Sequence, residues 1–421
     1  MKIEFHGAAR EVGRSGVLIE EGNKRILLDY GVKLGEERNE VPLPVDGYVD
    51  AVVLSHAHLD HSGEIPSLFV KSEQPVFMTP PTIPLAKMLI EDGLKVGRIK
   101  GIKMNYSASH LKRMMRNIIP VPYKKQRSIY DIELTFQDAG HILGSASAEL
   151  VFSDKKIVYT GDIKYEETRL HKPGFQKFKD VDVLIMESTY GNRLHEPREK
   201  TEKEFVEACN EVLDDGGNVV VPAFAVGRSQ EVLTVLSENH FNYPVYLDGM
   251  GKAVAEVMME FPEHLKDYDS FYKAMKKAEW VYTSRQRDRA LKEPSVIVST
   301  AGMLSGGPIM SYLLKMKELE TRKAIFFTGY QVEGTPGRKL IDTGRLTYMD
   351  YDLNFSDYEI KKFDFSAHTD QKGLIELVKK VDPSLVLLNH GDKEAEKELK
   401  KELTALDFEV KTPKFGQTIK V

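Results

Sequence analysis

Three histidines and one aspartate lie within six consecutive residues of this chain, at His56, His58, Asp60 and His61. They come directly after the apolar run at residues 51–54, which predicts a buried strand ending at the cluster. Neutral imidazoles suit zinc, and the hard carboxylate favours a water molecule on the metal, so the pattern indicates a dinuclear metal site that performs hydrolysis. A polar loop with incidental histidines is the alternative, and the density of residues at ligand spacing argues against it.

Two metal ions need more ligands than one hexapeptide supplies, and further acidic and histidine residues follow other apolar, strand-like runs. Each of them alone is more often a turn residue or a helix cap than a ligand. Their joint occurrence is informative, because loops at strand ends can aim side chains into one site without breaking a sheet. The additional candidates are Asp29, His141, Asp162, Glu187, His368 and His390.

Taken in chain order, these residues resemble the motifs of the metallo-β-lactamase superfamily, and specifically of its β-CASP branch of nucleic-acid nucleases. The resemblance spans nearly the whole chain. Segments 222–231, 301–308 and 329–334 point more closely to the nuclease subunit of the cleavage and polyadenylation specificity factor and its archaeal homologues, here without a KH domain, and ribonuclease J is a more distant cousin. The implied motifs 1 to 4 are Asp29, residues 56–61, His141 and Asp162, and the implied motifs A to C are Glu187, His368 and His390.

The resemblance implies that two zinc ions share a hydroxide that attacks a phosphodiester bond of single-stranded RNA in line, giving a 5′-phosphate and a 3′-hydroxyl. Asp60 would hold or deprotonate this nucleophile, and His368 would act as the general acid on the departing 3′ oxygen. Glu187 would keep His368 charged and oriented, while Asp29 would brace the loop of motif 2 rather than bind metal. The implied ligands are His56, His58 and His141 for one zinc, Asp60, His61 and His390 for the other, and Asp162 as the bridge.

The net charge of −5 looks unfavourable for RNA binding, because phosphate contacts normally dominate the affinity for nucleic acids. Residues 98–127, however, carry nine lysine and arginine residues and no acidic residue. Such a stretch can follow a phosphate backbone, with Tyr106 and Tyr123 offering faces for base stacking. A solvated helical face beside acidic neighbours explains it equally well. The candidate RNA contacts in this stretch are Arg98, Lys112, Arg113 and Arg116.

Ser305, Gly306 and Gly307 precede an apolar run and resemble a helix N-terminus, where free backbone amides could hold a phosphate. Ordinary turn chemistry explains the same residues and is the stronger interpretation. Arg228 and Arg338 are further candidate RNA contacts, the first for shaping a cleft and the second for presenting a cation.

At 421 residues, with 41% hydrophobic and 29% charged residues, the chain can bury sizeable cores and is expected to form two domains. No apolar run approaches ~18 residues, and the N-terminus lacks a basic segment ahead of an apolar one, so neither a membrane nor a secretory route is indicated. Cys209 is the only cysteine, which excludes an intrachain disulfide and favours His/Asp over thiolate ligands. A cytoplasmic location is therefore expected.

Short strand-like runs dominate the first part of the chain, and a regular alternation of strands and helices begins after residue 188. Thr201 and Glu204 form the pattern of a capping box that would start a helix there. Together with the resemblance, this predicts an α/β fold, a metallo-β-lactamase αββα sandwich with an inserted β-CASP domain built on a parallel sheet flanked by helices. The expected domains are 1–188 and 354–421 for the sandwich, which the chain re-enters with the run 358–363, and 189–353 for the insert.

Two other functions stay open. A small-molecule hydrolase of the same superfamily would share the metal ligands, but a small substrate does not need such a long insert. A partner-dependent, non-catalytic subunit of an RNA-processing complex would be expected to lack some ligands, and none is missing here. DNA-repair members of the branch typically carry valine at motif C, so His390 favours RNA. The sequence decides neither between endonuclease and 5′-3′ exonuclease cleavage nor whether the chain forms a homodimer.

Overall fold

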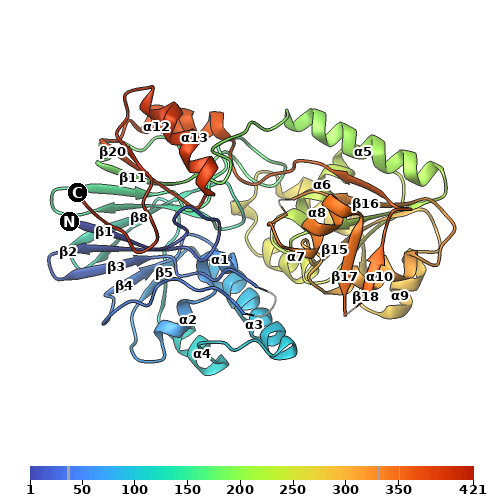
Figure 1. The fold of residues 1–421 in the computed structure, drawn as a ribbon, viewed down its shortest axis with the longest axis horizontal. Coiled ribbons are helices and arrows are strands. Elements are labelled where there is room, and N and C mark those ends of the chain that lie inside the picture. The colour runs from blue at the N-terminus through green and yellow to red at the C-terminus, as the bar shows by residue number, and fades with distance from the viewer. Residues whose placement is uncertain (36–37, 330, 350) are drawn as a thin grey trace. The chain divides into compact units, whose positions relative to one another are not determined.

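The computed structural model describes residues 1–35, 38–329, 331–349 and 351–421, which form two compact units (Figure 1). Tyr330, part of one glycine-bearing segment of the sequence, lies outside the described residues. Three stretches of the chain build unit 1, and a single long stretch with one short segment builds unit 2. Unit 1 comprises Met1–Glu167, Lys172–Leu194 and Ala367–Val421, and unit 2 comprises Thr168–His171 and His195–Ser366.

Unit 1 contains two seven-stranded sheets with an apolar core between them. Successive side chains of a strand point to opposite faces of its sheet. On their facing sides, Phe5 and Val17 of the first sheet (sheet 1) share a buried cluster with Phe136 and Leu150 of the second sheet (sheet 2). This period of two defines the inner faces of the sandwich. Sheet 1 has the order β22 (Thr418–Lys420), β1 (Lys2–Gly7), β2 (Gly16–Glu21), β3 (Lys24–Leu28), β4 (Ala51–Val53), β5 (Val76–Met78) and β6 (Ile118–Pro120).

Sheet 2 joins an antiparallel half to a parallel half. In the parallel half, the strand that ends at Asn389 lies beside the strand that ends at Glu187, although about half of the chain separates them. Sheet 2 has the order β21 (Val410–Lys411), β20 (Leu385–Asn389), β11 (Val183–Glu187), β10 (Lys156–Tyr159), β9 (Ala146–Val151), β8 (Ile132–Asp138) and β7 (Gln126–Ile129).

Helices cover the outer faces of this sandwich (Figure 1). Leu374 and Leu399, from the last two helices, pack with Leu184 and Leu388 of sheet 2 in a second apolar cluster. The predicted αββα layers are therefore confirmed. The helices of unit 1 are α1 (Leu59–Ser62), α2 (Ile65–Leu68), α3 (Thr82–Lys100) and α4 (Ala108–Arg116), which lie beside sheet 1, and α12 (Gln371–Val381) and α13 (Lys393–Thr404) on sheet 2.

Unit 2 is built on a six-stranded sheet in which all paired neighbours run parallel. Ile309 and Leu313 of α10 (Pro308–Met316) pack on one face of the sheet, and Phe205 of α5 (Arg198–Asp214) packs against Phe326 on the other. The predicted parallel sheet flanked by helices is confirmed. The strand order is β14 (Glu279–Val281), β13 (Val245–Asp248), β15 (Ser295–Ser299), β12 (Asn218–Pro222), β16 (Lys323–Phe327) and β19 (Glu359–Lys362).

Shorter elements complete unit 2. A hairpin packs beside α11, and its Leu346 joins the apolar cluster that contains α10. The remaining elements are α6 (Arg228–Glu238), α7 (Gly251–Met259), the 3₁₀ turn Pro262–His264, α8 (Tyr268–Lys277), α9 (Ser284–Ala290), α11 (Pro336–Thr343) and the hairpin β17 (Arg345–Tyr348) and β18 (Tyr351–Asn354).

The prediction that the chain re-enters the sandwich with residues 358–363 is wrong. Residues 359–362 form β19, which pairs in parallel with β16 at the edge of the sheet of unit 2. The run is short and mostly charged, so its pattern fits an edge strand of either unit, and only the pairing distinguishes them. We keep the division into an interrupted domain and one insert as a proposal, with the return placed after residue 366.

The predicted start of α5 is also wrong by four residues. The helix begins at Arg198, and Pro197 holds the N-cap position. Thr201 lies inside the first turns, and its hydroxyl donates to the Pro197 carbonyl at 3.4 Å instead of capping the helix. Over the described parts of the chain, no helix combines the length and the apolar character needed to cross a membrane.

Candidate metal centre

The predicted ligands of unit 1 lie where strands of its two sheets end. Asp29 follows β3, residues 56–61 follow β4 and form the start of α1, and Asp162 follows β10. Glu187 is the last residue of β11, and His390 follows β20. Because neighbouring parallel strands end at one edge, these side chains converge there, as the sequence pattern predicts.

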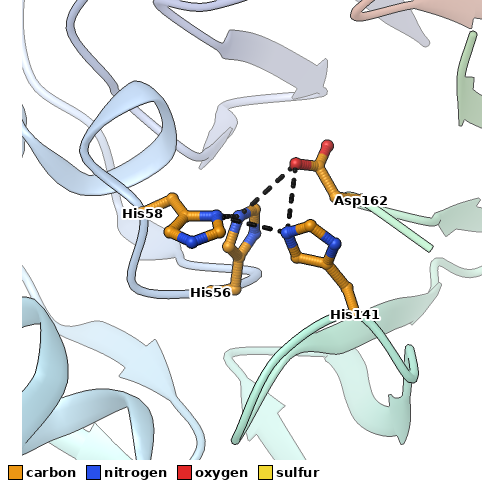
Figure 2. A group of neighbouring side chains, drawn as sticks. All are labelled: His56, His58, His141 and Asp162. Atoms are coloured by element: carbon orange, nitrogen blue, oxygen red, sulfur yellow. Dashed lines mark hydrogen bonds and ion pairs between the residues drawn. The ribbon is translucent and has the colours of Figure 1, made fainter. Parts of the chain in front are cut away.

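Figure 2 shows a first group of four side chains, from His56, His58, His141 and Asp162. Nδ1 of His58 lies 3.2 Å from Nε2 of His56 and 3.2 Å from Nε2 of His141. Oδ2 of Asp162 lies 3.5 Å from Nε2 of His56 and 3.7 Å from Nε2 of His141. One nitrogen or oxygen atom from each residue therefore faces a common point.

A second group consists of Asp60, His61 and His390. Oδ2 of Asp60 lies 3.3 Å from Nε2 of His390 and 3.9 Å from Nε2 of His61. Asp162 also reaches this group, with Oδ2 at 3.3 Å from Nε2 of His61 and Oδ1 at 3.3 Å from Nδ1 of His390. Its carboxylate thus lies between the two groups, which is the placement that a bridging ligand requires.

Three histidines of these groups have their outer ring nitrogen held by an oxygen atom. Nδ1 of His61 contacts the Asp29 carboxylate at 2.7 Å, and Nδ1 of His141 contacts the Ala367 carbonyl at 2.9 Å. Nδ1 of His56 contacts Oγ of Ser55 at 3.0 Å. A carboxylate and a carbonyl only accept, so Nδ1 carries a proton and Nε2 is the nitrogen that faces the centre.

Asp29 is fully buried and has its oxygen atoms occupied. Besides His61, it accepts hydrogen bonds at 2.7 Å each from the backbone N–H and the hydroxyl of Ser55 and from the hydroxyl of Tyr159. Its backbone has φ of 55°, a left-handed conformation that is uncommon outside glycine and asparagine. These contacts tie Asp29 to Ser55 and His61 at the two ends of the loop, and its role as a brace stays a proposal.

The electrostatic state of the first group and of the two carboxylates favours ligation. At His61, burial opposes protonation, but the charges of Asp162 and Asp60 raise the pKa well above the ordinary value. Burial lowers the pKa of His56 and His141 well below the ordinary value and that of His58 to about 4, so these imidazoles are neutral at neutral pH. Burial opposes ionisation of Asp60 and Asp162, but neighbouring histidines hold the pKa of both carboxyls below the ordinary range. Neutral imidazoles and ionised carboxylates are the forms that bind zinc.

A third group lies beside the first two and contains Glu187, His368 and Asp162. Nδ1 of His368 lies 3.0 Å from both carboxylate oxygens of Glu187, and its Nε2 lies 3.9 Å from Oδ2 of Asp162. Burial opposes protonation of His368, but the charges of Glu187 and Asp162 raise its pKa to about 9. His368 is therefore held as a proton donor at neutral pH.

The residues present fit a metal ion. Oδ1 of Asp162 is buried without a hydrogen bond among the described residues, and the ring nitrogens of the first group face one another instead of facing partners. A buried carboxylate oxygen without a hydrogen bond is unfavourable, and a cation among these atoms would compensate it. Imidazole and carboxylate donors are the set that zinc takes in hydrolytic sites.

The predicted RNA contacts on α3 and α4 are mostly solvent-facing. Arg98, Lys112 and Arg116 are exposed, whereas Nε of Arg113 donates to Glu73 at 3.0 Å. Tyr106 is buried, so the expectation that its ring offers a stacking face is wrong. The hydroxyl of Tyr123 donates to the Ser145 carbonyl at 2.7 Å inside the unit. The exposed cations remain candidate RNA contacts.

The predicted contacts in unit 2 differ in exposure. Gly306 and Gly307 have positive φ values and form the turn into α10, so the turn and the helix N-terminus coincide there, next to the exposed Ser305. Arg338 pairs with Asp342 at 2.7 Å on the surface of α11, whereas Arg228 is 8% exposed at the start of α6. Their contact with RNA stays a prediction.

Sequence reasoning missed the polar residues that hold the ligands. Ser55 and Tyr159 complete the hydrogen bonds of Asp29, and both could have been found as polar residues at or next to the end of an apolar strand. Lys164 was missed as well: it is 7% exposed and donates to the carbonyl of His368 at 3.0 Å. A buried lysine two residues after Asp162 gives no signal in a single sequence.

Three family models match the chain. The Beta-Casp domain matches residues 229–340, in unit 2. The model described as a Zn-dependent metallo-hydrolase RNA specificity domain matches residues 357–413, which contain His368 and His390. The model of the anti-Pycsar protein Apyc1 matches residues 6–195, which contain the other candidate ligands.

Similar proteins are found in archaea. The chain is 38% identical to the probable RNase MJ4 of Methanocaldococcus jannaschii over 431 aligned residues, covering all of both chains. It is 38% identical to RNase aCSPSF2 of Saccharolobus solfataricus, covering 99% of this chain and 85% of that protein. It is 36% identical to the transcription termination factor FttA of Methanosarcina mazei, covering 94% of this chain and 67% of that protein.

A solved structure supports the fold. The crystal structure of a protein of unknown function from Enterococcus faecalis V583 aligns with 99% of each chain at a TM-score of 0.56. Its sequence identity is 16%, so this likeness concerns the fold alone.

Proposed function

This chain belongs to the β-CASP ribonuclease branch of the metallo-β-lactamase superfamily, and from that premise we propose that it hydrolyses phosphodiester bonds of single-stranded RNA with two zinc ions. It is a metal-dependent hydrolase, and the names of its relatives support RNA as the substrate. The observation that carries the proposal is the position of Asp162, which lies between two groups of metal donors and beside the His368–Glu187 pair.

In the proposed assignment, His56, His58 and His141 hold one zinc ion, and Asp60, His61 and His390 hold the other. Asp162 contacts both groups and would bridge them. When bound, two zinc ions supply a nucleophile at neutral pH by lowering the pKa of water to ~7, and they neutralise charge on the scissile phosphate.

The protein's own groups would move the protons. The Asp60 carboxylate, whose pKa is held low by its histidine neighbours, is ionised and can accept a proton from the attacking water. Nε2 of His368 faces the centre and would donate its proton to the departing 3′ oxygen, while Glu187 holds Nδ1. The products of this reaction are a 5′-phosphate and a 3′-hydroxyl.

Further aspects of the function stay proposals. A cytoplasmic location, a homodimer and partners in an RNA-processing complex are compatible with the sequence. The exposed Arg98, Lys112 and Arg116 would guide the phosphate backbone by their charge. The alternatives are a small-molecule hydrolase and a subunit that needs a partner for activity, and both would leave RNA intact.

The test is cleavage, with added zinc, of one RNA labelled separately at its 5′ and 3′ ends, beside DNA of the same sequence. Wild type should cut the RNA and spare the DNA, and the two labels distinguish internal cuts from removal of 5′ nucleotides. His368→Ala should lose about 10²–10⁴-fold in rate, the range of a general acid. His240→Asn, which changes an exposed histidine of unit 2, is the control and should cut normally.

Two results would overturn the proposal. Intact RNA with zinc-loaded protein would favour a small-molecule hydrolase or a partner-dependent subunit. Equal rates for wild type and His368→Ala would remove the general acid from the assignment.

A further inference from the structure

We propose that Lys164 and Glu166 form a clamp that positions His368 for proton transfer. The inference rests on the proposed function, because it takes His368 as the general acid. In it, Lys164 is a positioning residue and has no contact with the reacting atoms. The clamp acts on the backbone of the segment that carries the imidazole.

His368 lies in a segment without regular structure. Residues 363–370 connect β19 to α12, and neither a helix nor a strand holds them. Glu187 orients the ring of His368 through Nδ1, but this contact acts on the side chain and does not hold the backbone of the segment. Proton transfer needs the donor within hydrogen-bond reach of the departing oxygen, so the segment itself must be held.

Three consecutive residues of this segment are held by hydrogen bonds to other stretches of unit 1. The Ala367 carbonyl contacts Nδ1 of His141 at 2.9 Å, and the His368 carbonyl accepts from Nζ of Lys164 at 3.0 Å. The Thr369 amide donates to the Ile163 carbonyl at 2.9 Å. Two of these three bonds come from the two residues that directly follow Asp162.

Lys164 is held tightly enough to act as an anchor. Its side chain is 9% exposed, and Nζ pairs with Oε2 of Glu166 at 2.9 Å. Its backbone N–H donates to the Ala139 carbonyl at 2.9 Å, and its carbonyl accepts from Gly174 at 2.7 Å. A buried ammonium with two oxygen partners has little freedom to reach toward RNA, so it works through His368.

Glu166 extends the clamp to Thr369. Its carboxylate oxygens lie 3.3 and 3.5 Å from Oγ1 of Thr369. Space for this contact depends on Gly373 in the first turn of α12, where an added Cβ would lie 2.2 Å from Oγ1 of Thr369 and 3.1 Å from Oε1 of Glu166. Alanine is favoured over glycine inside helices, so a glycine at this position fits a requirement for close approach.

The same strand supplies a matched control. Lys156 begins β10, whereas Lys164 follows the end of β10. Nζ of Lys156 also contacts one carbonyl, that of Lys179 at 3.0 Å, and one carboxylate, that of Glu149 at 3.4 Å. Lys156→Met therefore removes the same kinds of contact far along the strand from the metal centre.

The test compares RNA with bis(p-nitrophenyl) phosphate, whose leaving group departs without being protonated. In Lys164→Met, kcat for RNA should fall about 10–100-fold, because a displacement of ~1 Å can cost 10²-fold, while KM and zinc content stay unchanged. The rate on the nitrophenyl ester should stay within about threefold. Lys164→Arg should recover part of the loss, Glu166→Gln should show a smaller one, and Lys156→Met should show none.

Hydrogen exchange gives a readout that needs no catalysis. Exchange at residues 367–370 should rise in Lys164→Met and not in Lys156→Met, because Lys164 holds the His368 carbonyl next to the Thr369 amide. Unchanged exchange overturns the clamp whatever the two substrates show.

The kinetic outcomes keep this inference apart from the proposed function. An equal loss on both substrates in Lys164→Met, or no loss on either, overturns the clamp. His368→Ala should lose RNA cleavage and keep ester hydrolysis, and an equal loss on both would instead overturn the role of His368 as general acid.

Discussion

Two buried clusters of charged residues, one in each unit, are completed in different ways. The arginine–glutamate cluster of unit 2, formed by Arg169, Arg198, Glu202, Glu231 and Glu238, contains its own cations. Arg169 donates to Glu202 at 2.6 and 2.9 Å and to Glu238 at 2.6 Å, and Arg198 donates to Glu202 at 2.8 Å and to Glu231. Glu202 and Glu231 are nearly fully buried, yet each carboxylate has an arginine partner.

The three donor groups that the structure describes in the metal centre of unit 1 consist of histidine, aspartate and glutamate, without an arginine. Its imidazoles bring ring nitrogens within 3.2 Å of one another, and Oδ1 of Asp162 is buried without a hydrogen bond among the described residues. A structural cluster and a binding site therefore differ in where their balancing charge comes from. Protein groups complete the charge balance of the first, whereas the second requires a cation from solution.

The largest expected effect comes from Asp162→Asn. The amide keeps the size of the side chain but removes the charge that both donor groups share, so zinc binding and RNA cleavage should fail together. We expect a loss of RNA cleavage of about 10³-fold or more, the equivalent of the several kcal/mol that metal ions contribute. Zinc stoichiometry and initial rates measure both quantities, and a fully zinc-loaded, active variant would contradict the shared role of Asp162.

The opposite pattern is expected for Glu231→Ala. It leaves the half-buried Arg198 with one carboxylate partner fewer, so the free energy of unfolding should fall by about 1.5–3 kcal/mol, the range of a hydrogen bond to a charged group. Zinc binding per folded molecule should not change. Urea unfolding of the metal-free protein measures the first effect. A larger loss of metal-free stability in Asp162→Asn than in Glu231→Ala would contradict the assignment of the unit 2 cluster as structural and of the unit 1 cluster as a binding site.

Zinc itself should stabilise the protein through unit 1 alone. At a free zinc concentration of about 100 times Kd, mass action adds about 2.7 kcal/mol to the free energy of unfolding for each site. Thermal unfolding with zinc and with a chelator should show this gain in wild type and in Glu231→Ala. Asp162→Asn should lose most of it, and an undiminished gain in that variant would place zinc elsewhere.

The smallest expected effect is a shift in the pH profile. Glu187, with Asp162, raises the pKa of His368 to about 9 against the effect of burial, and the protonated form is the proton donor. Cleavage of RNA is therefore expected to be lost as the pH rises through this pKa, which bound zinc would lower. Glu187→Gln should move the alkaline limb about 1–2 pH units downward. A limb that stays in place would argue against the Glu187–His368 pair.

The sequence predicted most of the site because ligands are read from residue type and from position at strand ends. The spacing of His56, His58, Asp60 and His61 needs no tertiary information, and residues as distant as His390 follow apolar runs of the same kind. The structure brings all of them to one edge of the sandwich. The fold class followed from the same runs and from the family resemblance.

What escaped prediction depends on contacts between distant residues. Strand β19 belongs to unit 2 because it pairs with β16, and the types of its four residues do not indicate which strand it pairs with. Tyr106 is buried although it lies in a basic stretch. It precedes α4 and so does not belong to the solvent-facing side of that helix. The start of α5 was misplaced because Thr201 has the composition of a cap but donates to Pro197 inside the helix.

The position of β20 inside sheet 2 has a consequence for synthesis on the ribosome. This strand inserts between β11 and β21, and His390 follows it, so the centre receives this imidazole about 200 residues after Glu187 has been made. A nascent chain that ends before β20 exposes the edge of β11 and, in the proposed assignment, lacks His390 of the second donor group. We therefore expect ribonuclease activity only from chains whose synthesis has passed β20.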